Sequence, residues 1–363
     1  MRLLIIGPFP EPINGCSLAN EVLLKQAKLH KNISVNYIDT NSREISSKHV
    51  GMFSFTKVFS FIKTYKSIFY INKADVVYIT PGQTFYGVVK YMPFFLNCLL
   101  FGKPYLIHIH GNHLGNEYKS LQGFRRYLFS IFLKKASAGI VLSDYLKSNF
   151  EGLLNPEKIF IVENFAQDDL VQEVQIEKPK DMLRLLYLSN LMEEKGIIDF
   201  LDCLILLKEN KILFTADIAG NVEDKCDFVI RNKFKELQGH IKYHGVVTGI
   251  QKKDLLEKAN IFILPTYYRM EGQPISIIEA MATGNIILTT NFSGIPDIVS
   301  RANGYFIQPK NPKNIYDRLL EINQDLAKNI DSFSYTNMEY VKSNFTENQF
   351  SNKIIKLVQQ LLQ

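Results

Sequence analysis

The chain has 363 residues, of which 46% are hydrophobic and 21% charged. This length exceeds what one hydrophobic core usually organises, so two domains of roughly 150 to 200 residues are expected. The composition is that of a globular protein. The 4 cysteines are scattered and form no CxxC pair, which disfavours a zinc site or a disulfide framework and favours a reducing compartment such as the cytoplasm. The N-terminal apolar stretch is too short for a signal peptide, and no other run is long enough to span a bilayer.

The formal net charge of +6 is unevenly distributed along the chain. Residues 1–175 hold 19 Lys and Arg against 13 Asp and Glu, whereas residues 176–363 hold 23 of each. Within 45–135 there are 12 basic and 2 acidic residues, interleaved with Phe and Tyr. An anionic partner is therefore expected for this part of the chain. Nucleic acid is disfavoured because no recognition module is present.

An anionic membrane surface is the partner that this pattern favours. Residues 123–135 are predicted to form a basic amphipathic helix, which can lie on a membrane with its aromatic face buried. An ordinary surface helix that packs its apolar face on a sheet would show the same pattern. The basic residues assigned to this face are Lys57, Lys63, Lys66, Arg125, Arg126, Lys134 and Lys135.

Short apolar runs alternate along the chain with longer helix-like segments, as is typical of parallel sheets with crossover helices. The strands expected in the first half are 2–6, 34–38, 75–79, 104–109, 139–142 and 158–162, with helices at 17–29, 56–70 and 121–135. A polar stretch at 166–181 is predicted to be a linker. The second series of strands is 183–188, 213–218, 241–243, 261–264, 286–290 and 304–307, followed by a last helix at 347–361.

The most informative segment is 264–299, LPTYYRMEGQPISIIEAMATGNIILTTNFSGIPDIV. A buried strand is expected to end there, followed by a polar loop and a helix that starts at Pro274, whose fixed φ suits a first helical turn. The first N–H groups of a helix have no partner inside it and attract anions. The amides of Gln273, Ile275 and Ser276 are therefore predicted to bind a diphosphate.

Two carboxylates lie on either side of this helix start. Glu271 precedes the helix and Glu279 lies within it, so both are expected to face one ligand from different heights. Carboxylates accept hydrogen bonds from sugar hydroxyls. The alternative is that Glu271 is a loop charge and Glu279 a solvated helix residue.

This segment resembles the Glu-x7-Glu signature of the retaining family-4 glycosyltransferases of GT-B fold. The similarity includes EG-x-P, EAMA-x-G and the later SGIPDIV. The resemblance implies that Glu271 holds the transferred sugar and that Glu279 holds the nucleotide ribose. It assigns the distal phosphate to the amides near Gln273 to Ile275, and Gly272 and Pro274 are further donor-binding residues of the same turn.

A second similarity to this family lies in LYLSNLMEEKGIIDFL, at the start of the second series of strands. Lys195 matches the lysine that neutralises the donor diphosphate, where a cation would stabilise the charge that develops on the leaving group. The alternative is a solvent-exposed lysine at a helix start. Asn190 stands where the family has an arginine, so that position keeps a hydrogen-bond donor but no charge.

The first half carries two further candidates. In GPFPEPINGCSLAN, Gly15 would let the backbone approach the donor and Ser17 would cap a helix, although a simple turn would look the same. No GxGxxG motif is present. In HIHGNH at 108–113, His110 matches a family histidine that contacts the donor sugar, the alternative being a hydrogen-bonded core histidine. A metal site is disfavoured because no carboxylate is nearby in sequence and the chain has no DxD motif.

The sequence thus predicts an α/β protein of GT-B fold, with two Rossmann-like doubly wound domains facing a central cleft. The expected domains are 1–168 for the acceptor and 182–345 for the donor, with a helix in 346–363 that packs back on the first. The resemblance implies a metal-independent hexosyltransferase without a cofactor, which moves a sugar with retention from a nucleoside-diphosphate sugar to a glycan hydroxyl.

A lipid-linked acceptor of surface polysaccharide biosynthesis (capsule or O-antigen) is expected, with the protein peripheral on the inner face of the cytoplasmic membrane. Two other functions are compatible with the same motifs. One is a nucleotide-sugar epimerase of the same fold, and the other is an inactive nucleotide-sugar-binding subunit.

Overall fold

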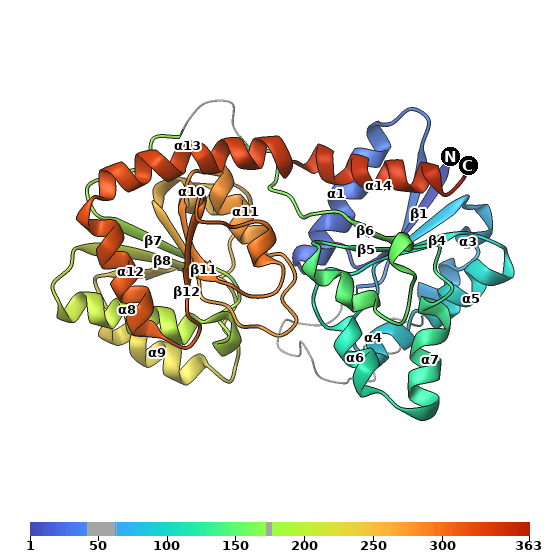
Figure 1. The fold of residues 1–363 in the computed structure, drawn as a ribbon, viewed down its shortest axis with the longest axis horizontal. Helices are drawn as coiled ribbons and strands as arrows, with labels where there is room; N and C mark the ends of the chain where they lie inside the picture. Colours follow the sequence, from blue (N-terminus) through green and yellow to red (C-terminus); the bar gives the residue numbers. More distant parts are fainter. Residues whose placement is uncertain (42–61, 63, 172–175) are drawn as a thin grey trace. The chain divides into compact units, whose positions relative to one another are not determined.

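The computed structural model divides the chain into two compact units, each with its own core (Figure 1). Unit 1 comprises residues 1–164 and 347–363, and unit 2 comprises residues 165–346. The structure describes all residues except 42–61, 63 and 172–175. The stretch predicted as a linker, 166–181, belongs to unit 2 in its described part, where Ala166 and Leu170 are buried in the core.

Unit 1 is built on a six-stranded parallel sheet in the order β2-β1-β3-β4-β5-β6. Its strands are β1 (Arg2–Gly7), β2 (Ser34–Asp39), β3 (Val76–Ile79), β4 (Tyr105–His108), β5 (Ala138–Val141) and β6 (Ile159–Ile161). Every residue of β3, β4 and β5 is buried, because helices cover both faces of the sheet. The helices α1 and α14 lie on one face and α4 to α7 on the other (Figure 1). The α-helices described in unit 1 are α1 (Gly15–Leu29), α3 (Tyr70–Lys73), α4 (Phe85–Val89), α5 (Met92–Leu100), α6 (Leu114–Ser120), α7 (Gly123–Leu133) and α14 (Glu347–Gln360).

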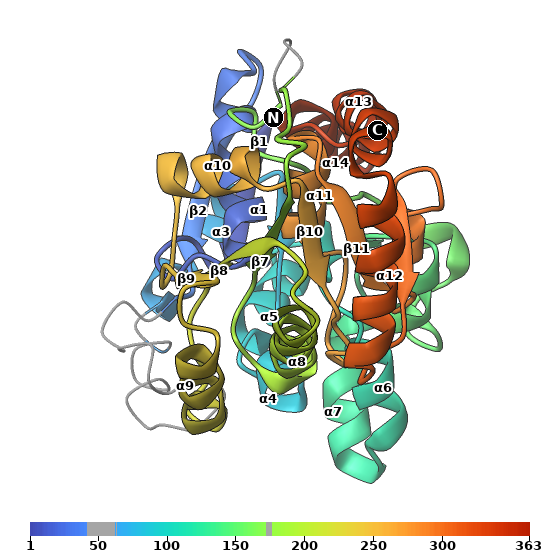
Figure 2. The ribbon, with the colours of Figure 1, turned by 90° about the vertical axis from the view of Figure 1, so that its left-hand side faces the viewer.

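Unit 2 contains a second six-stranded parallel sheet, in the order β12-β11-β10-β7-β8-β9. Its strands are β7 (Leu183–Leu188), β8 (Phe214–Ala219), β9 (Ile241–Tyr243), β10 (Ile261–Leu264), β11 (Ile286–Thr290) and β12 (Gly304–Ile307). Figure 2 shows α10, α11 and α13 on one face and α8, α9 and α12 on the other. These helices are α8 (Ile197–Glu209), α9 (Asp227–Glu236), α10 (Gly249–Lys258), α11 (Ile275–Ala282), α12 (Pro312–Gln324) and α13 (Leu326–Asn344).

The predicted fold class is confirmed. Each expected strand is present with its ends within one residue of the prediction, because the apolar runs that signal a buried parallel strand are bounded by polar or glycine residues. The helix expected at 56–70 lies largely outside the described residues.

Ser17 takes part in capping the first helix, as predicted, but it is not the N-cap residue. Asn14 is the N-cap, and its Oδ1 accepts hydrogen bonds from the amides of Cys16 and Ser17 at 3.1 and 3.0 Å. The Ser17 hydroxyl accepts a hydrogen bond from the Asn14 amide at 2.9 Å, which completes a capping box. The helix therefore starts two residues earlier than expected, at Gly15.

The last helix of the chain, α14, packs in unit 1. It lies beside α1 on the same face of the sheet (Figure 1), and it buries Phe350, Ile354, Ile355 and Val358. Phe350 lies near the end of β4, with its ring centroid 6.2 Å from that of His108. The core of unit 1 thus includes the end of the chain as well as its beginning.

We expect Phe350→Ala to destabilise unit 1 by about 3 to 5 kcal/mol, because Phe350 is 2% exposed and its removal leaves a cavity. The matched control is Phe124→Ala in α7, where the side chain is 73% exposed and the expected cost is within about 0.5 kcal/mol. Chemical denaturation followed by circular dichroism measures both. Equal losses in the two variants would contradict the packing described for α14.

Candidate functional site

The strand order of unit 2 places a topological switch point at the carboxyl edge of its sheet. β7 and β10 are neighbours, but the chain continues from β7 to β8 on one side and from β10 to β11 on the other. The loops that follow β7 and β10 therefore run apart, and ligands of open α/β sheets bind at such a switch point. The loop after β7 carries Asn190 and Lys195, and the loop after β10 carries Glu271.

Lys195 and the buried Glu271 form a partly buried ion pair at this switch point. The Lys195 Nζ lies 2.7 Å from the Glu271 Oε2, and the two side chains are 14% and 7% exposed. The hydroxyl of Thr266 donates to the same carboxylate oxygen at 2.9 Å. The ring of Tyr268 lies 5.1 Å from the lysine nitrogen. Pairing compensates for the loss of water around both charges.

Gly196 brings Lys195 to this position. Gly196 has φ +78°, and a Cβ atom on it would lie 2.4 Å from the carbonyl oxygen of Pro265. The turn that contains Lys195 therefore packs directly against the end of β10. The Tyr187 hydroxyl donates to the Lys195 carbonyl at 3.2 Å and also holds the turn. Sequence reasoning assigned no role to this glycine.

The start of α11 lies between the two glutamates in sequence. Pro274 is the N-cap, one position earlier than the first-turn place predicted for it, and the helix begins at Ile275. Among the described residues, no side chain caps this helix, and its first turn has no acidic residue. In the fully described stretch 271–290, all residues are buried except Ile275 and Ser276, which are half-buried. A ligand can therefore approach the positive end of this helix at its first turn.

Glu279 lies one turn further along α11 and pairs with a lysine from α10. The Lys252 Nζ lies 2.6 Å from the Glu279 Oε1, and the side chains are 13% and 4% exposed. The same ammonium donates to the Gln167 Oε1 at 2.6 Å. Burial raises the pKa of Glu279, and the charge of Lys252 opposes this rise.

Sequence reasoning missed Lys252, Gln167 and Thr266. A signal for Lys252 was present, because the helix that carries it buries Leu255 and Leu256 three and four positions later, which places Lys252 near the apolar face of α10. A lysine at such a position needs a partner. The sequence does not single out Gln167 or Thr266, because polar residues are common in loops and directly after strands.

The other residues predicted for the donor lie in loops. Asn190 is exposed after β7, and its carbonyl accepts a hydrogen bond from the Tyr187 hydroxyl at 3.2 Å. Gly272 and Gln273 are buried before α11, where the Gly272 carbonyl accepts from the Gly294 amide at 3.2 Å. Gly15 is exposed at the first position of α1.

His110 follows β4 in unit 1 and stacks on His108, with ring centroids 4.1 Å apart. The Tyr78 hydroxyl lies 2.6 Å from the His108 Nδ1. Among the described residues, neither ring nitrogen of His110 has a hydrogen-bond partner, and nor has Nε2 of His108. Burial lowers the pKa of His110 to about 3 and that of His108 well below its usual value. Both rings are therefore neutral near pH 7. In the described part of the chain, no three His, Cys, Asp or Glu side chains gather as a metal site.

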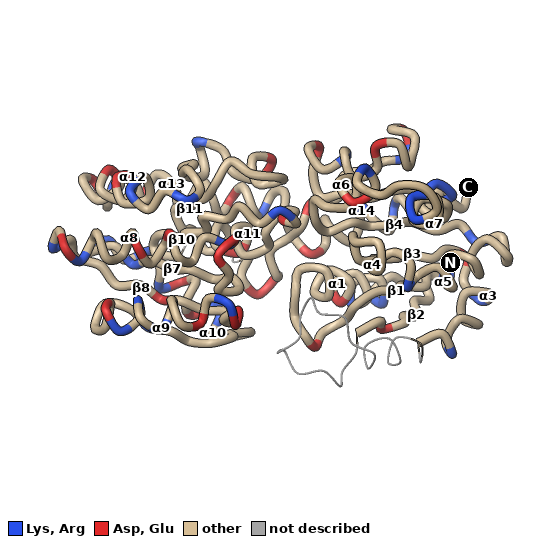
Figure 3. Tube along the Cα trace, turned by 90° about the horizontal axis from the view of Figure 1, so that it is seen from below, with Lys and Arg blue, Asp and Glu red and all other residues tan. Residues whose placement is uncertain are grey.

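The basic residues predicted for a membrane face lie in unit 1, except that Lys57 and Lys63 fall outside the described residues. Arg125, Arg126, Lys134 and Lys135 are exposed in or directly after α7, which carries blue segments in Figure 3. Lys66 is exposed in the turn before α3. None of the described helices combines the length and apolar character needed to cross a membrane.

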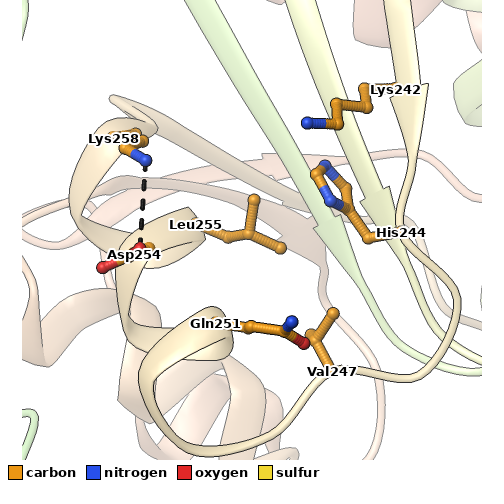
Figure 4. A pocket seen from close by; sticks show the side chains of 7 residues that line it. All are labelled: Lys242, His244, Val247, Gln251, Asp254, Leu255 and Lys258. Atoms are coloured by element: carbon orange, nitrogen blue, oxygen red, sulfur yellow. Dashed lines mark ion pairs between the residues drawn. The ribbon is translucent and has the colours of Figure 1, made fainter.

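A pocket of about 220 Å³ lies elsewhere in unit 2, between α10 and β9 (Figure 4). Its lining includes His244, which lies 2.6 Å from Asp217, and the ion pair of Lys258 with Asp254 at 4.0 Å. None of the residues of the two lysine–carboxylate pairs, Lys195, Glu271, Lys252 and Glu279, lines this pocket. This pocket is therefore separate from the carboxylate pairs.

The fold is that of a GT-B protein, and the candidate ligand site lies at the switch point of unit 2. Residues 168–336 match the family model described as "Glycosyl transferases group 1". That range includes both carboxylates, both lysines and α11. The part of unit 2 that carries the candidate site is therefore similar to glycosyl transferases group 1.

Curated relatives are similar to this chain at low identity. The amylovoran biosynthesis glycosyltransferase AmsK of Erwinia amylovora is 27% identical over 132 residues, 35% of this chain and 32% of the relative. The N,N'-diacetylbacillosaminyl-diphospho-undecaprenol alpha-1,3-N-acetylgalactosaminyltransferase of Campylobacter jejuni is 26% identical over 213 residues, 55% of this chain and 54% of the relative. This chain spans about half the length of the first curated relatives that it matches.

Solved structures are similar over nearly the whole chain. The Anabaena protein Alr3699/HepE in complex with UDP has a TM-score of 0.74 at 13% identity, and the similarity covers 99% of this chain and 100% of that chain. Sucrose-phosphate synthase from Thermosynechococcus elongatus has a TM-score of 0.75 at 14% identity, covering 99% of this chain and 98% of that chain. At these identities the similarity establishes the fold, and the predicted GT-B fold class is confirmed.

We expect Gly196→Ala to lower the free energy of unfolding by about 2 to 4 kcal/mol, because the new methyl group adds a clash with the Pro265 carbonyl to the strain of a positive φ. Gly245→Ala is the matched control, with φ +67° and nothing within 4 Å of the added Cβ. It should cost about 1 kcal/mol. Denaturant titration measures both, and similar losses would contradict the close packing at Gly196.

Proposed function

We propose that this protein transfers a hexose, with retention of anomeric configuration, from a nucleoside-diphosphate sugar to a hydroxyl of a lipid-linked glycan. The pathway that we propose is the biosynthesis of a surface polysaccharide such as capsule or O-antigen. One observation carries the proposal. Two buried, lysine-paired carboxylates, Glu271 and Glu279, flank the uncapped start of α11 within the domain matched by the family model.

The donor is proposed to bind across this helix start. The amides of Ile275 and Ser276 would donate to the distal phosphate, since they lie at the positive end of the helix. The Glu279 Oε1 is bonded to Lys252, so Oε2 would accept from the ribose hydroxyls. The Glu271 Oε2 is bonded to Lys195 and Thr266, which leaves Oε1 for a hydroxyl of the transferred sugar.

Lys195 is proposed to stabilise the leaving nucleoside diphosphate. Negative charge grows on the phosphate oxygens as the glycosidic bond breaks, and a preorganised ammonium lowers the energy of that state. We propose that this lysine and the helix amides neutralise the charge without a metal ion, and that the departing phosphate accepts the proton of the acceptor hydroxyl. His110 is neutral, and its ring nitrogens have no hydrogen-bond partner in the part of the chain that the structure describes, so it is assigned to hydrogen-bond a sugar hydroxyl. Asn190 and Gly15 are assigned to the donor as weaker contacts.

We further propose that unit 1 binds an anionic membrane surface through α7. Phe124 and Tyr127 are 73% and 60% exposed, and the basic residues of the helix lie beside them. The Arg125 and Arg126 guanidinium groups lie 4.6 and 4.5 Å from the ring centroids of Phe85 and Tyr118. Aromatic rings and basic side chains on one helix are the combination that favours anionic lipid surfaces. Peripheral attachment to the inner face of the cytoplasmic membrane would bring the enzyme to a lipid-linked acceptor.

We expect a nucleoside-diphosphate sugar to raise the thermal stability of the protein, by about 2.7 kcal/mol at a concentration 100-fold above Kd. Lys195→Met and Glu271→Gln should weaken this effect and lower transfer by on the order of 100-fold or more, because each removes a group that contacts donor charge or sugar. Thermal-shift screening of a nucleotide-sugar panel, followed by release of nucleoside diphosphate with and without acceptor, measures both.

The matched control for Lys195→Met is Lys258→Met, which removes a lysine with a 69% exposed side chain from the same unit. It should leave binding and transfer unchanged. Product formation from the nucleotide sugar without acceptor would instead identify an epimerase. Normal cellular glycan in strains that carry Lys195→Met or Glu271→Gln would identify an inactive binding subunit.

We expect the protein to bind vesicles that contain phosphatidylglycerol at low salt and to be released as ionic strength rises. Each of Lys134→Ala and Lys135→Ala should weaken this binding by roughly fivefold, since a basic residue near such a surface contributes about 1 kcal/mol. Phe124→Ala should also weaken it, whereas Phe228→Ala, a 77% exposed phenylalanine of unit 2, should not. Sedimentation with vesicles measures the binding, and no affinity at low salt would remove the basis for a membrane-held acceptor.

A further inference from the structure

We propose that Lys252 is a positioning residue for the donor site, which holds the Glu279 carboxylate in place as an ionised hydrogen-bond acceptor for the nucleotide. The proposal rests on the function proposed above, in which Glu279 binds the ribose. It extends that function by a residue to which neither the sequence motifs nor the comparisons assign a role.

The contacts of Lys252 fix its ammonium group from two sides. Its Nζ lies 2.6 Å from the Glu279 Oε1 of α11 and 2.6 Å from the Gln167 Oε1 of the segment that precedes β7. Two directed hydrogen bonds to acceptors on separate segments leave a long lysine side chain little freedom. The position of the Glu279 carboxylate is therefore coupled to α10 and to the segment around Gln167.

The position of Lys252 on α10 would cost free energy if the lysine were not paired with Glu279. Lys252 is 13% exposed, near the side of α10 that buries Leu255 and Leu256. A lysine there has lost most of its hydration, and so has Glu279 at 4% exposure. Each charge compensates for the burial of the other. The exposed lysines of the same helix, such as Lys258, have no such requirement.

The charges around Glu279 act in opposite directions. Burial raises the pKa of the carboxyl, Lys252 opposes that rise, and Asp169 adds to it. Gln167 is uncharged, and Lys253 donates to the Asp169 carbonyl at 2.9 Å rather than to Glu279. Among the groups that the structure describes around Glu279, Lys252 is the cation that favours its ionised form. Without it the pKa of Glu279 would rise further.

An ionised Glu279 matters for the ligand because only a carboxylate presents acceptors alone. Lys252 bonds Oε1, which leaves Oε2 to accept hydrogen bonds from a pair of ribose hydroxyls. A protonated carboxyl would carry a donor at one oxygen and would match such a pair less well. Lys252 thus acts on the ligand through Glu279 and does not need to touch it.

The test is a double-mutant cycle on nucleotide binding, measured by calorimetry with UDP and GDP as probes between about pH 6 and about pH 9. We expect Lys252→Met to weaken binding by about tenfold near pH 7. Because the pKa of Glu279 rises when Lys252 is lost, affinity in this variant should increase with pH over a range where the parent is level. Lys252→Arg should restore most of the binding. Protonation of the probe itself affects all variants alike and cancels in the comparison.

Glu279→Gln supplies the background that separates the possible roles of Lys252. In that background, adding Lys252→Met should cause no further loss, since Lys252 acts through the carboxylate. The double variant also removes both charges together, which buried pairs often tolerate, so it keeps the test valid if Lys252→Met alone unfolds. Lys258→Met is the matched control and should bind like the parent at every pH.

Two results would overturn the proposal. Equal losses from Lys252→Met in the parent and in the Glu279→Gln background would show that Lys252 acts on the ligand independently of Glu279. A lowered Tm without any change in the pH profile of binding would show a structural role only. Failure of the parent protein to bind any nucleoside diphosphate or nucleotide sugar is a different result, which would reject the proposed function and the role of Lys252 with it.

Discussion

The candidate site of unit 2 depends on two ion pairs in which a lysine compensates for the burial of a carboxylate. Glu271 and Glu279 are 7% and 4% exposed, and an ionised carboxylate without a partner in such surroundings costs several kcal/mol. Each has its own lysine, Lys195 from the turn after β7 and Lys252 from α10. Neither ion pair forms between neighbours in sequence. The folded sheet is therefore required before either charge can be buried at an acceptable cost.

The strand order of the sheet brings one of these lysines to its carboxylate. Adjacent β7 and β10 place the ends of two loops at the same edge, and Gly196 allows the first loop to touch the end of the second strand. Helix α11 then starts within the same region with its first turn half-buried and uncapped. Carboxylates, cations and free helix amides are thus brought to one edge by backbone connectivity.

In unit 1, by contrast, two buried titratable side chains are neutral. His108 and His110 stack against each other without a counter-charge, and burial keeps both neutral near pH 7. Among the described residues, three of the four ring nitrogens have no hydrogen-bond partner, and leaving buried polar atoms unpaired costs free energy. Lysine-paired carboxylates and neutral histidines therefore offer a ligand different chemistry.

The sequence by itself determined the fold class and the strands and singled out the candidate donor segment, because these depend on local signals. Apolar runs, turn residues and the spacing of Glu271, Pro274 and Glu279 are all readable within a few tens of residues. Local patterns were insufficient to choose between two possible N-cap residues. The N-cap of α1 is Asn14 and not Ser17. Only the tertiary structure decided which lysine pairs with which carboxylate. Lys195 and Glu271 are 76 residues apart, and Lys252 and Glu279 are 27 residues apart. Such contacts depend on strand order and helix packing, and both arise from burial of the whole core rather than from any single segment.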